Sequence, residues 1–287
     1  MRLDDVLTIV ARETGDDVGV REVRVDHPER LVVEADLGTR HVVIKAAVPD
    51  GPMPGGDLAK EIRATDAARA AGVAVPPRML WHEGPPAVYV AEFVSGHELA
   101  ADSPDSWWRA TGAALRRLHG GAGTDGFPYF GGRDSWWGWL HEWTEYERDR
   151  ALADGFVTPA AVERLTAVLR RAFADRAEPP PTLLHGDCGP YHWLLRDETV
   201  VAALDFGDAG LGDPAFDLAT LTLWDRDRLG VVLAGYGAEP AFAAHTRELQ
   251  LPYHVIRHLA AADWLVDHGF DATPTVVELE RIADALG

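Results

Sequence analysis

Two carboxylates and one imidazole lie near each other in the second half of the sequence, beside short apolar runs. The stretch LLHGDCGPYHWLL puts Asp187 on a glycine-containing loop after a short strand, and His192 follows five positions later. The stretch VVAALDFGD is a second strand, which delivers Asp205 at its end. Carboxylates at two strand ends, with a polar ligand between them, can bind a hard divalent cation. Because catalytic groups tend to sit on loops held by a rigid scaffold, these three residues form the candidate site.

The elements that must position these residues change in character along the chain. Residues 1–13 have helical spacing, and the segments after them alternate or run apolar with β-branched residues, as antiparallel strands do. The predicted strands are 20–26, 30–37, 40–47, 78–84 and 87–94, with a Pro- and Gly-rich loop at 49–56 and a helix at 57–72. From about residue 105 onward the pattern is mostly helical. We therefore expect a strand-rich lobe over 1–95 and a larger helical lobe over 96–287.

The composition argues against several classes of partner. The 287 residues include 27 Lys and Arg against 46 Asp and Glu, which gives a net charge of −19. Such an acidic surface repels nucleic acid and anionic membranes and attracts cations, although a plain solvated surface has the same charge. The single cysteine, Cys188, allows no internal disulfide and suits a reducing compartment. The acidic first residues and the lack of a stretch of about 20 apolar residues predict a cytoplasmic protein without a membrane segment.

Over nearly its whole length the chain resembles the aminoglycoside phosphotransferase family, which are small-molecule kinases similar in fold to protein kinases. The resemblance rests on HGDCGPYHWLL, on LDFGDAGLGDPAFDLA at 204–219, and on the lysine and hinge described next. It implies an α+β, bilobal, protein-kinase-like fold, with a small antiparallel sheet in the N-terminal lobe and a mostly helical C-terminal lobe. It also implies that Asp187 orients the acceptor hydroxyl and accepts its proton, while Asp205 binds Mg²⁺ on the phosphates.

The same resemblance assigns the nucleotide half of the site to the strand-rich lobe. Lys45 in VVIKA closes an apolar strand, where a lysine neutralises the α- and β-phosphates of ATP or GTP. Glu61 in AKEIRAT lies on the next helix and would pair with Lys45. In the hinge at about 91–97, the carbonyl of Glu92 and the amide of Val94 would bond the base. A solvated lysine and an ordinary strand end are the alternatives.

Two features depart from the family's pattern. His192 stands where the family has an asparagine that binds the metal; a neutral imidazole can also bind a divalent ion, although Mg²⁺ prefers oxygen. Some relatives, macrolide phosphotransferases among them, carry histidine here, so we expect His192 to be a metal ligand. The first strand turn reads VDHPERL and has no glycine, whereas protein kinases cover the phosphates with G-x-G-x-x-G. A degenerate, non-catalytic protein is the alternative.

Two other residues of the motif region have expected structural roles. His185, two residues before Asp187, is expected to brace the loop by hydrogen bonds rather than to react. Asp217 begins a helix in PAFDLA. The resemblance implies that Asp217 bonds the backbone of the catalytic loop, and a helix N-cap is the alternative.

The acceptor side is expected in the helical lobe. Trp136, Trp139 and Trp143 are three and four positions apart in SWWGWLHEW, so they share one helix face. Such a stripe usually belongs to a core; the alternative is an apolar or sugar-stacking wall, because the family builds its acceptor pocket from this insertion. Glu142, and His258 on a late helix, are further candidates for acceptor contacts.

Together these observations predict an ATP- or GTP-dependent O-phosphotransferase with Mg²⁺ as cofactor. The expected acceptor is a hydroxylated small-molecule antibiotic of the aminoglycoside type, or a macrolide or nucleoside antibiotic, so that phosphorylation confers resistance. The acidity favours a cationic, amine-bearing acceptor. Two alternatives stay open: a metabolic kinase for choline, homoserine or a sugar, and a kinase-like protein that binds ligands without catalysis. We expect no nucleic-acid or membrane partner, and a monomer or homodimer.

Overall fold

The computed structural model describes residues 2–26, 30–47 and 58–286, and the chain forms two compact units. Unit 1 combines residues 1–123 with 185–209, and unit 2 combines residues 124–184 with 210–287. Both units are therefore discontinuous in sequence, and the segment 185–209 folds with the N-terminal part of the chain. The expected division into functional lobes at residue 95 stays a prediction.

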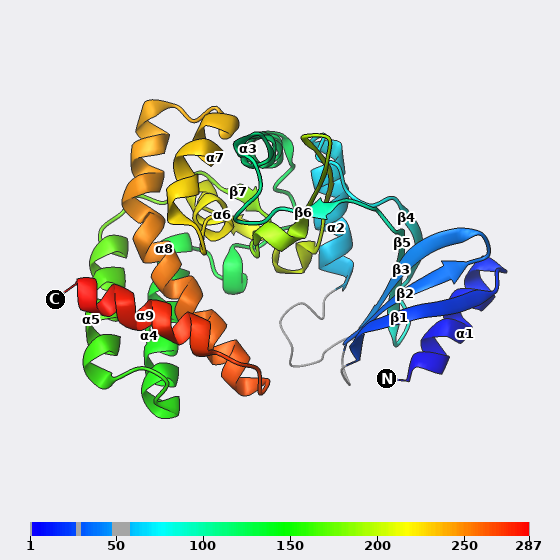
Figure 1. Cartoon of the computed structure of the whole chain (residues 1–287), viewed down its shortest axis with the longest axis horizontal. Helices are drawn as coiled ribbons and strands as arrows, with labels where there is room; N and C mark the ends of the chain where they lie inside the picture. Colours follow the sequence, from blue (N-terminus) through cyan, green and yellow to red (C-terminus); the bar gives the residue numbers. More distant parts are fainter. Residues whose placement is uncertain (1, 27–29, 48–57, 287) are drawn as a thin grey trace. The chain divides into compact units, whose positions relative to one another are not determined.

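Five antiparallel strands form the main sheet of unit 1, in the order β1-β2-β3-β5-β4. They are β1 (Val18–Asp26), β2 (Arg30–Leu37), β3 (Arg40–Ala47), β4 (Arg78–His82) and β5 (Ala87–Glu92). Burial alternates along β2 and most of β3, so one face of each strand carries buried aliphatic side chains. Helix α1 (Leu3–Thr14) packs on this face through Val6 and Val10 (Figure 1). The predicted strands and first helix are confirmed, whereas the predicted loop 49–56 lies outside the described residues.

Helix α2 (Leu58–Ala70) packs against side chains of the opposite face of the sheet. Leu58 and Ile62 of this helix form an apolar cluster with Tyr89 of β5. Glu61 precedes Ile62 and is only 4% exposed, so the helix brings a buried carboxylate to the sheet. The helix stops before Gly72, whose φ of 78° lies in the left-handed region that a glycine adopts without strain.

The rest of unit 1 includes α3 (Asp105–Gly121) and a sheet of three short strands. These strands are β6 (His97–Glu98), β8 (Trp193–Arg196) and β9 (Thr199–Ala203), in the order β6-β8-β9. The chain enters β6 through Gly96, where an added Cβ would lie 3.0 Å from Leu194 Cβ and 3.1 Å from Val201 Cγ2. Glycine at 96 thus lets the segment after β5 lie directly on the β8–β9 hairpin.

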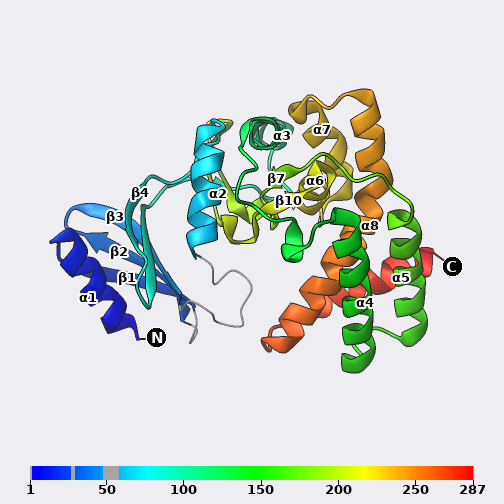
Figure 2. The ribbon, with the colours of Figure 1, turned by 180° about the vertical axis from the view of Figure 1, so that it is seen from behind.

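Unit 2 is mainly helical. Its helices are α4 (Trp136–Asp154), α5 (Pro159–Phe173), α6 (Pro214–Leu221), α7 (Leu229–Tyr236), α8 (Pro240–Asp267) and α9 (Thr273–Ala285). Two short strands, β7 (Thr182–Leu184) and β10 (Gly210–Gly212), pair antiparallel. Helices α4 and α5 lie side by side in both views of the ribbon (Figures 1 and 2). The core between the helices is aromatic, and its largest fully buried side chains are Trp136, Phe173, Phe216 and Tyr253.

The observed elements confirm the expected fold class, an antiparallel sheet in the N-terminal region followed by a helical C-terminal region. Helices α4 and α5 begin with side-chain caps: Ser135 accepts from the amide of Gly138, and Thr158 accepts from the amide of Ala161. None of the helices in the described part of the chain combines the length and apolar composition needed to span a bilayer.

Candidate active site

Asp205 lies at the centre of a charged cluster in unit 1. Lys45 Nζ lies 3.2 Å from Asp205 Oδ1 and 2.5 Å from Glu61 Oε1. The Nη2 atom of Arg30 lies 3.2 Å from Oδ1 and 3.1 Å from Oδ2 of Asp205. The predicted pair between Lys45 and Glu61 is therefore formed. The cluster holds two cations and two carboxylates, so its formal charges cancel.

Strand register explains how the two cations come together. β2 and β3 pair so that Val32 lies opposite Lys45 and Arg30 lies opposite Ala47. Arg30 and Lys45 are therefore diagonal neighbours on one face of the sheet, at a separation that long side chains can bridge. This is the face against which α2 packs, and α2 contributes Glu61 to the cluster.

Asp205 joins the cluster through an unusual backbone conformation. Its φ is 60°, in the left-handed region that residues other than glycine seldom adopt. It follows β9 and stands at the N-terminus of the short 3₁₀ helix η3 (Phe206–Asp208). Such a conformation costs of order 1 kcal/mol or more and persists where the surroundings hold it, which is common at functional sites.

The charges of the cluster keep both central groups ionised. Burial by itself would raise the pKa of Asp205, but Lys45, Arg30 and His192 hold that pKa well below its usual range. Burial by itself would lower the pKa of Lys45, but Asp205 and Glu61 raise it above its ordinary value. In these charge states the carboxylate can attract a cation, and the lysine beside it can attract a phosphate.

Asp187 and His192 lie together near this cluster. The Nε2 atom of His192 is 3.2 Å from Asp187 Oδ2, and the two side chains are 13% and 26% exposed, respectively. His192 ends the 3₁₀ helix η2 (Pro190–His192), directly before β8. Because His192 also lowers the pKa of Asp205, one loop and one hairpin bring all three motif residues into a single region of unit 1.

His185 braces the motif loop, as the sequence predicted. It is fully buried, and its Nε2 atom lies 2.8 Å from the carbonyl oxygen of Leu204. Its ring also contacts that of Phe206, with the centroids 4.6 Å apart. Since Leu204 and Phe206 flank Asp205, His185 ties the loop of Asp187 to the turn of Asp205.

The donor atoms present suit a magnesium ion bound together with phosphate. Protein sites for Mg²⁺ use one or two carboxylates and leave the other positions to water and phosphate oxygens. Asp205 offers an ionised carboxylate that is 30% exposed, and His192 is close enough to act on its charge. The carboxylate of Asp205 fits such a site, while the roles of Asp205 and His192 as metal ligands stay predictions.

The predicted hinge residues lie at the end of β5. The amide of Glu92 donates to the carbonyl of Pro77, and the amide of Phe93 donates to the carbonyl of His41, both at 2.9 Å. Glu92 is exposed and Val94 is half-buried. These bonds fix the segment on the sheet, while the base contacts of Glu92 and Val94 stay predictions.

The acceptor candidates lie in unit 2, and the structure divides them. The tryptophan stripe does share one helix face: the rings of Trp136 and Trp139 are 5.1 Å apart, and those of Trp139 and Trp143 are 4.6 Å apart. Trp136 is fully buried and donates to the hydroxyl of Tyr253 at 3.2 Å, so it is a core residue. His258 is fully buried as well. Neither side chain presents a surface to an acceptor in this structure, as expected for core residues, and their role as acceptor contacts stays an untested prediction.

The remaining candidates keep part of their surface. Trp139 and Trp143 are half-buried beside the core, and Glu142 is exposed and pairs with Arg133 at 2.6 Å. The structure corrects the alternative proposed for Asp217. The N-cap of α6 is Asp213, which accepts from the amide of Ala215 at 3.0 Å, whereas Asp217 is fully buried inside the first turn.

Two residues that the sequence did not single out have notable environments in the structure, Arg30 and Glu147. Arg30 contacts Asp205, and the available signal was the strand alternation that puts Arg30 on the face of Lys45. Glu147 is 3% exposed and accepts from Trp143 Nε1 at 2.7 Å. Burial raises the pKa of Glu147 to about 8. Its signal was a position four residues after Trp143, on the face of the tryptophan stripe.

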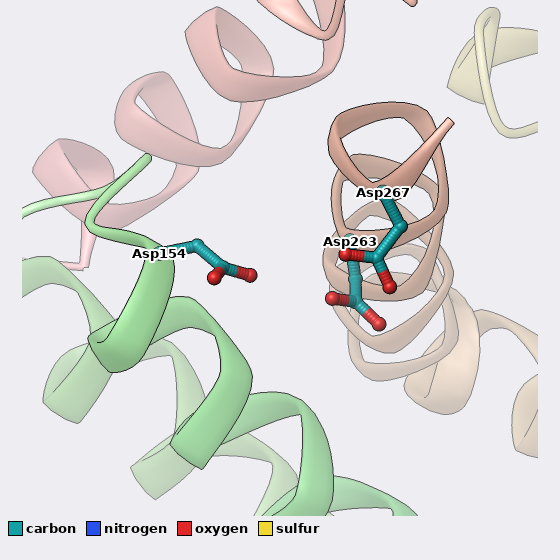
Figure 3. A group of neighbouring side chains, drawn as sticks. All are labelled: Asp154, Asp263 and Asp267. Carbon is teal, nitrogen blue, oxygen red and sulfur yellow. The ribbon is translucent and has the colours of Figure 1, made fainter. Parts of the chain in front are cut away.

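A separate acidic group in unit 2 is bridged by an arginine. Asp154 of α4 faces Asp263 and Asp267 of α8 (Figure 3). In the described part of the chain this is the one set of three such side chains whose ligand atoms lie within 4.8 Å of one another. Arg150 lies 3.3, 2.7 and 2.5 Å from the three carboxylates, in that order. We therefore read the group as an ion-pair network that joins two helices.

Fold and site together define a class of protein. An antiparallel sheet carries a lysine that pairs with a helix glutamate, a β-hairpin supports the two motif aspartates, and helices follow. These features are those of a kinase-like phosphotransferase. A model of the family described as "Phosphotransferase enzyme family" matches residues 27–251, and the chain belongs to this family.

Solved structures agree with this assignment at the level of the fold. Aminoglycoside phosphotransferase APH(4)-Ia, in a ternary complex with ADP and hygromycin B, is 16% identical, with a TM-score of 0.69 and coverage of 98% of this chain and 97% of that one. Macrolide 2'-phosphotransferase MphH from Brachybacterium faecium is 21% identical, with a TM-score of 0.61 and coverage of 99% and 97%. A protein from Thermobifida fusca YX-ER1, named as a candidate fructosamine-3-kinase, is 23% identical, with a TM-score of 0.68 and coverage of 98% and 99%. No curated protein matches the chain.

Proposed function

We propose that the protein transfers the terminal phosphoryl group of ATP or GTP to a hydroxyl group of a small-molecule antibiotic. An aminoglycoside-type acceptor is favoured, with a macrolide or a nucleoside antibiotic as the other candidates, and phosphorylation would confer resistance. The observation that carries the proposal is the contact of Lys45 with both Glu61 and Asp205, in the unit that also holds Asp187. The single cysteine, Cys188, is buried and cannot form an internal disulfide, which agrees with action in the reducing cytoplasm.

Lys45 and Asp205 would hold the nucleotide's phosphates. Lys45 is fixed by Glu61, so its ammonium group can bind the α- and β-phosphate oxygens without losing its position. Asp205 and His192 would bind Mg²⁺, which neutralises charge on the transferring phosphoryl group. Glu92 and Val94 would bond the base through their backbone, in the manner of a hinge.

Asp187 would act on the acceptor. Its carboxylate is partly exposed and adjacent to His192, so it can accept a hydrogen bond from an incoming hydroxyl group. As the acceptor oxygen bonds to the γ-phosphorus, the bond from that phosphorus to the bridging oxygen breaks and the nucleoside diphosphate leaves. The hydroxyl proton passes to Asp187, so atoms and charge balance.

Asp187→Asn tests the catalytic part of the proposal. The amide cannot accept the proton, so kcat should fall about 10²- to 10⁴-fold while the KM for the nucleotide stays within about twofold. Release of ADP or GDP with a phosphorylatable antibiotic is the measurement. Asp125→Asn, an exposed substitution in unit 2, serves as the matched control and should keep full activity. Turnover of D187N at the parent rate would contradict the role of Asp187 and favour a binding protein.

A metabolic kinase is the second candidate, because one of the structural neighbours is named as a candidate fructosamine-3-kinase. A screen of the purified protein against antibiotics and against metabolites such as choline, homoserine and sugars separates the two. Turnover of an antibiotic, together with raised resistance in a sensitive bacterium that expresses the gene, would support the proposal. Turnover of a metabolite alone would contradict the resistance role.

A further inference from the structure

Arg30 is an arginine whose hydrogen-bonding capacity is only partly used within the described part of the chain. A guanidinium group has five N–H donors in a planar fork. One nitrogen of Arg30, Nη2, bonds both oxygens of Asp205. The Nε atom is buried and has no hydrogen-bond partner among the described residues. A guanidinium group that binds a carboxylate through one nitrogen keeps its other N–H donors for a second anion.

The position of Arg30 points toward the nucleotide's phosphates. It is the first residue of β2, and it shares a sheet face with Lys45. In kinase folds the segment between the first two strands covers the phosphates with the backbone amides of a glycine-rich loop. The corresponding sequence here, VDHPERL, contains no glycine. A charged side chain at the start of β2 can supply the positive field that such amides provide.

The charge balance of the cluster favours an exchange of Asp205 for phosphate as the partner of Arg30. Without a ligand, Lys45 and Arg30 balance Asp205 and Glu61. A divalent ion bound by Asp205 would add two positive charges to the cluster and would compete with Arg30 for the carboxylate. A triphosphate brings about four negative charges, and the guanidinium fork matches its oxygens in geometry and charge.

We propose that Arg30 is a phosphate ligand of the donor nucleotide, which exchanges the Asp205 carboxylate for phosphate oxygens when nucleotide and metal bind. The inference rests on the proposed function, because it assumes that the Lys45–Asp205 cluster is the nucleotide site. It predicts two effects of opposite sign. Loss of the Arg30 charge weakens binding of a triphosphate, and it strengthens binding of a divalent ion alone, because a competitor for Asp205 is removed.

The test compares a nucleotide with its phosphate-free counterpart. Arg30→Gln keeps a neutral donor toward Asp205 but loses the charge and the fork. By titration calorimetry with Mg²⁺, R30Q should bind ATP or GTP, whichever the parent prefers, about tenfold more weakly, since one charge-assisted hydrogen bond corresponds to roughly that ratio. Binding of adenosine or guanosine should stay within about twofold. Mn²⁺ without nucleotide, followed by its electron spin resonance signal, should bind R30Q more tightly than the parent.

Two further variants complete the design. Arg21→Gln is the matched control, because Arg21 lies on β1 of the same sheet but pairs with Asp36, at 2.7 Å, and not with a member of the cluster. This variant should leave the affinities for triphosphate, nucleoside and Mn²⁺ unchanged. Arg30→Lys keeps the charge without the fork and should lie between R30Q and the parent. If R30Q does not unfold cooperatively, R30K carries the test, with a threefold or greater loss of triphosphate affinity expected.

The outcomes separate the inference from the function beneath it. A parent that binds neither ATP nor GTP would contradict the proposed function, and this inference with it. A parent that binds the triphosphate, with R30Q or R30K showing the same ratio of triphosphate to nucleoside affinity, would contradict the role of Arg30 alone. Weaker binding of Mn²⁺ to R30Q would also contradict it, because Arg30 would then help the metal rather than compete with it.

Discussion

Glu147 is a buried carboxyl whose ionisation depends on its surroundings rather than on its type. Burial is the main cause that raises its pKa to about 8, and the nearby Asp263 acts in the same direction. Trp143 donates to one oxygen, while Oε2 is buried without a hydrogen-bond partner among the described residues. A neutral carboxylic acid satisfies such a site better than a carboxylate, because an ion would lose its hydration without compensation.

Glu147→Gln should therefore change the pH dependence of stability. The pKa of Glu147 is higher in the folded than in the unfolded state, so between about pH 4.5 and 8 the folded state binds more protons. The free energy of unfolding of the parent must then fall as the pH rises through this window. The amide does not ionise, so E147Q should exceed the parent by about 2 kcal/mol or more at pH 8 and by less at pH 5.

Urea denaturation at pH 5 and pH 8 measures this difference. Glu280→Gln, an exposed substitution on α9, is the control and should shift both values equally or not at all. If E147Q and the parent lost the same stability between the two pH values, Glu147 would be ionised in the folded state and the assignment would fail.

At the scale of elements, the pair of short strands β7 and β10 packs directly against Trp136. Gly212 of β10 lies so close to Trp136 that an added Cβ would stand 2.4 Å from its Cζ3 atom and 2.8 Å from Leu184 Cδ1. Trp136 is itself held by its bond to Tyr253, which bonds Asp213 at 2.9 Å. A close-packed core that is also hydrogen-bonded has little room to move.

Gly212→Ala should destabilise the protein. The added methyl group must displace a tryptophan ring or the strand, so the free energy of unfolding should fall by about 1 to 3 kcal/mol. Gly230→Ala is the matched control, because nothing lies within 4 Å of an added Cβ in helix α7 and alanine favours a helix. Thermal unfolding compares the two, and a G212A variant as stable as G230A would show that this core accommodates the methyl group.

Elements also show which parts of the fold were predictable. The strands β2 and β3 were recognised because their apolar side chains alternate, and this period is a local property of the sequence. The tryptophan stripe on α4 was recognised from its spacing of three and four residues, which is also a local property. The burial of each ring was not predictable, because this spacing shows that Trp136, Trp139 and Trp143 share a face but not how deeply each lies in the core.

For the whole molecule, the net charge of −19 is the property most relevant to an acceptor. Acidic clefts and surfaces attract cations and raise their rate of association, and salt weakens this attraction. Under the proposed function, a polycationic antibiotic approaches a protein of opposite charge. The same charge disfavours anionic partners such as nucleic acid.

The salt dependence of turnover tests this electrostatic contribution. For a cationic acceptor, kcat/KM should fall about three- to tenfold between roughly 20 and 200 mM KCl, because screening removes the attraction. The N-acetylated form of the same acceptor, which has lost its positive charges, is the control and should show little dependence on salt. Equal salt dependence for both forms would show that the acidity of the protein plays no part in acceptor binding.

The sequence by itself determined the types and order of the elements and the candidate residues for the chemistry. Asp187, His192, Asp205, Lys45 and Glu61 were all named from motifs and from the family resemblance that those motifs carry. Only the tertiary structure decided which of them meet and what else joins them. Arg30 bonds Asp205 across 175 positions of the chain, while Trp136 and His258 lie in the core. Such contacts depend on strand register and helix packing, which bring distant residues together and which no local spacing encodes.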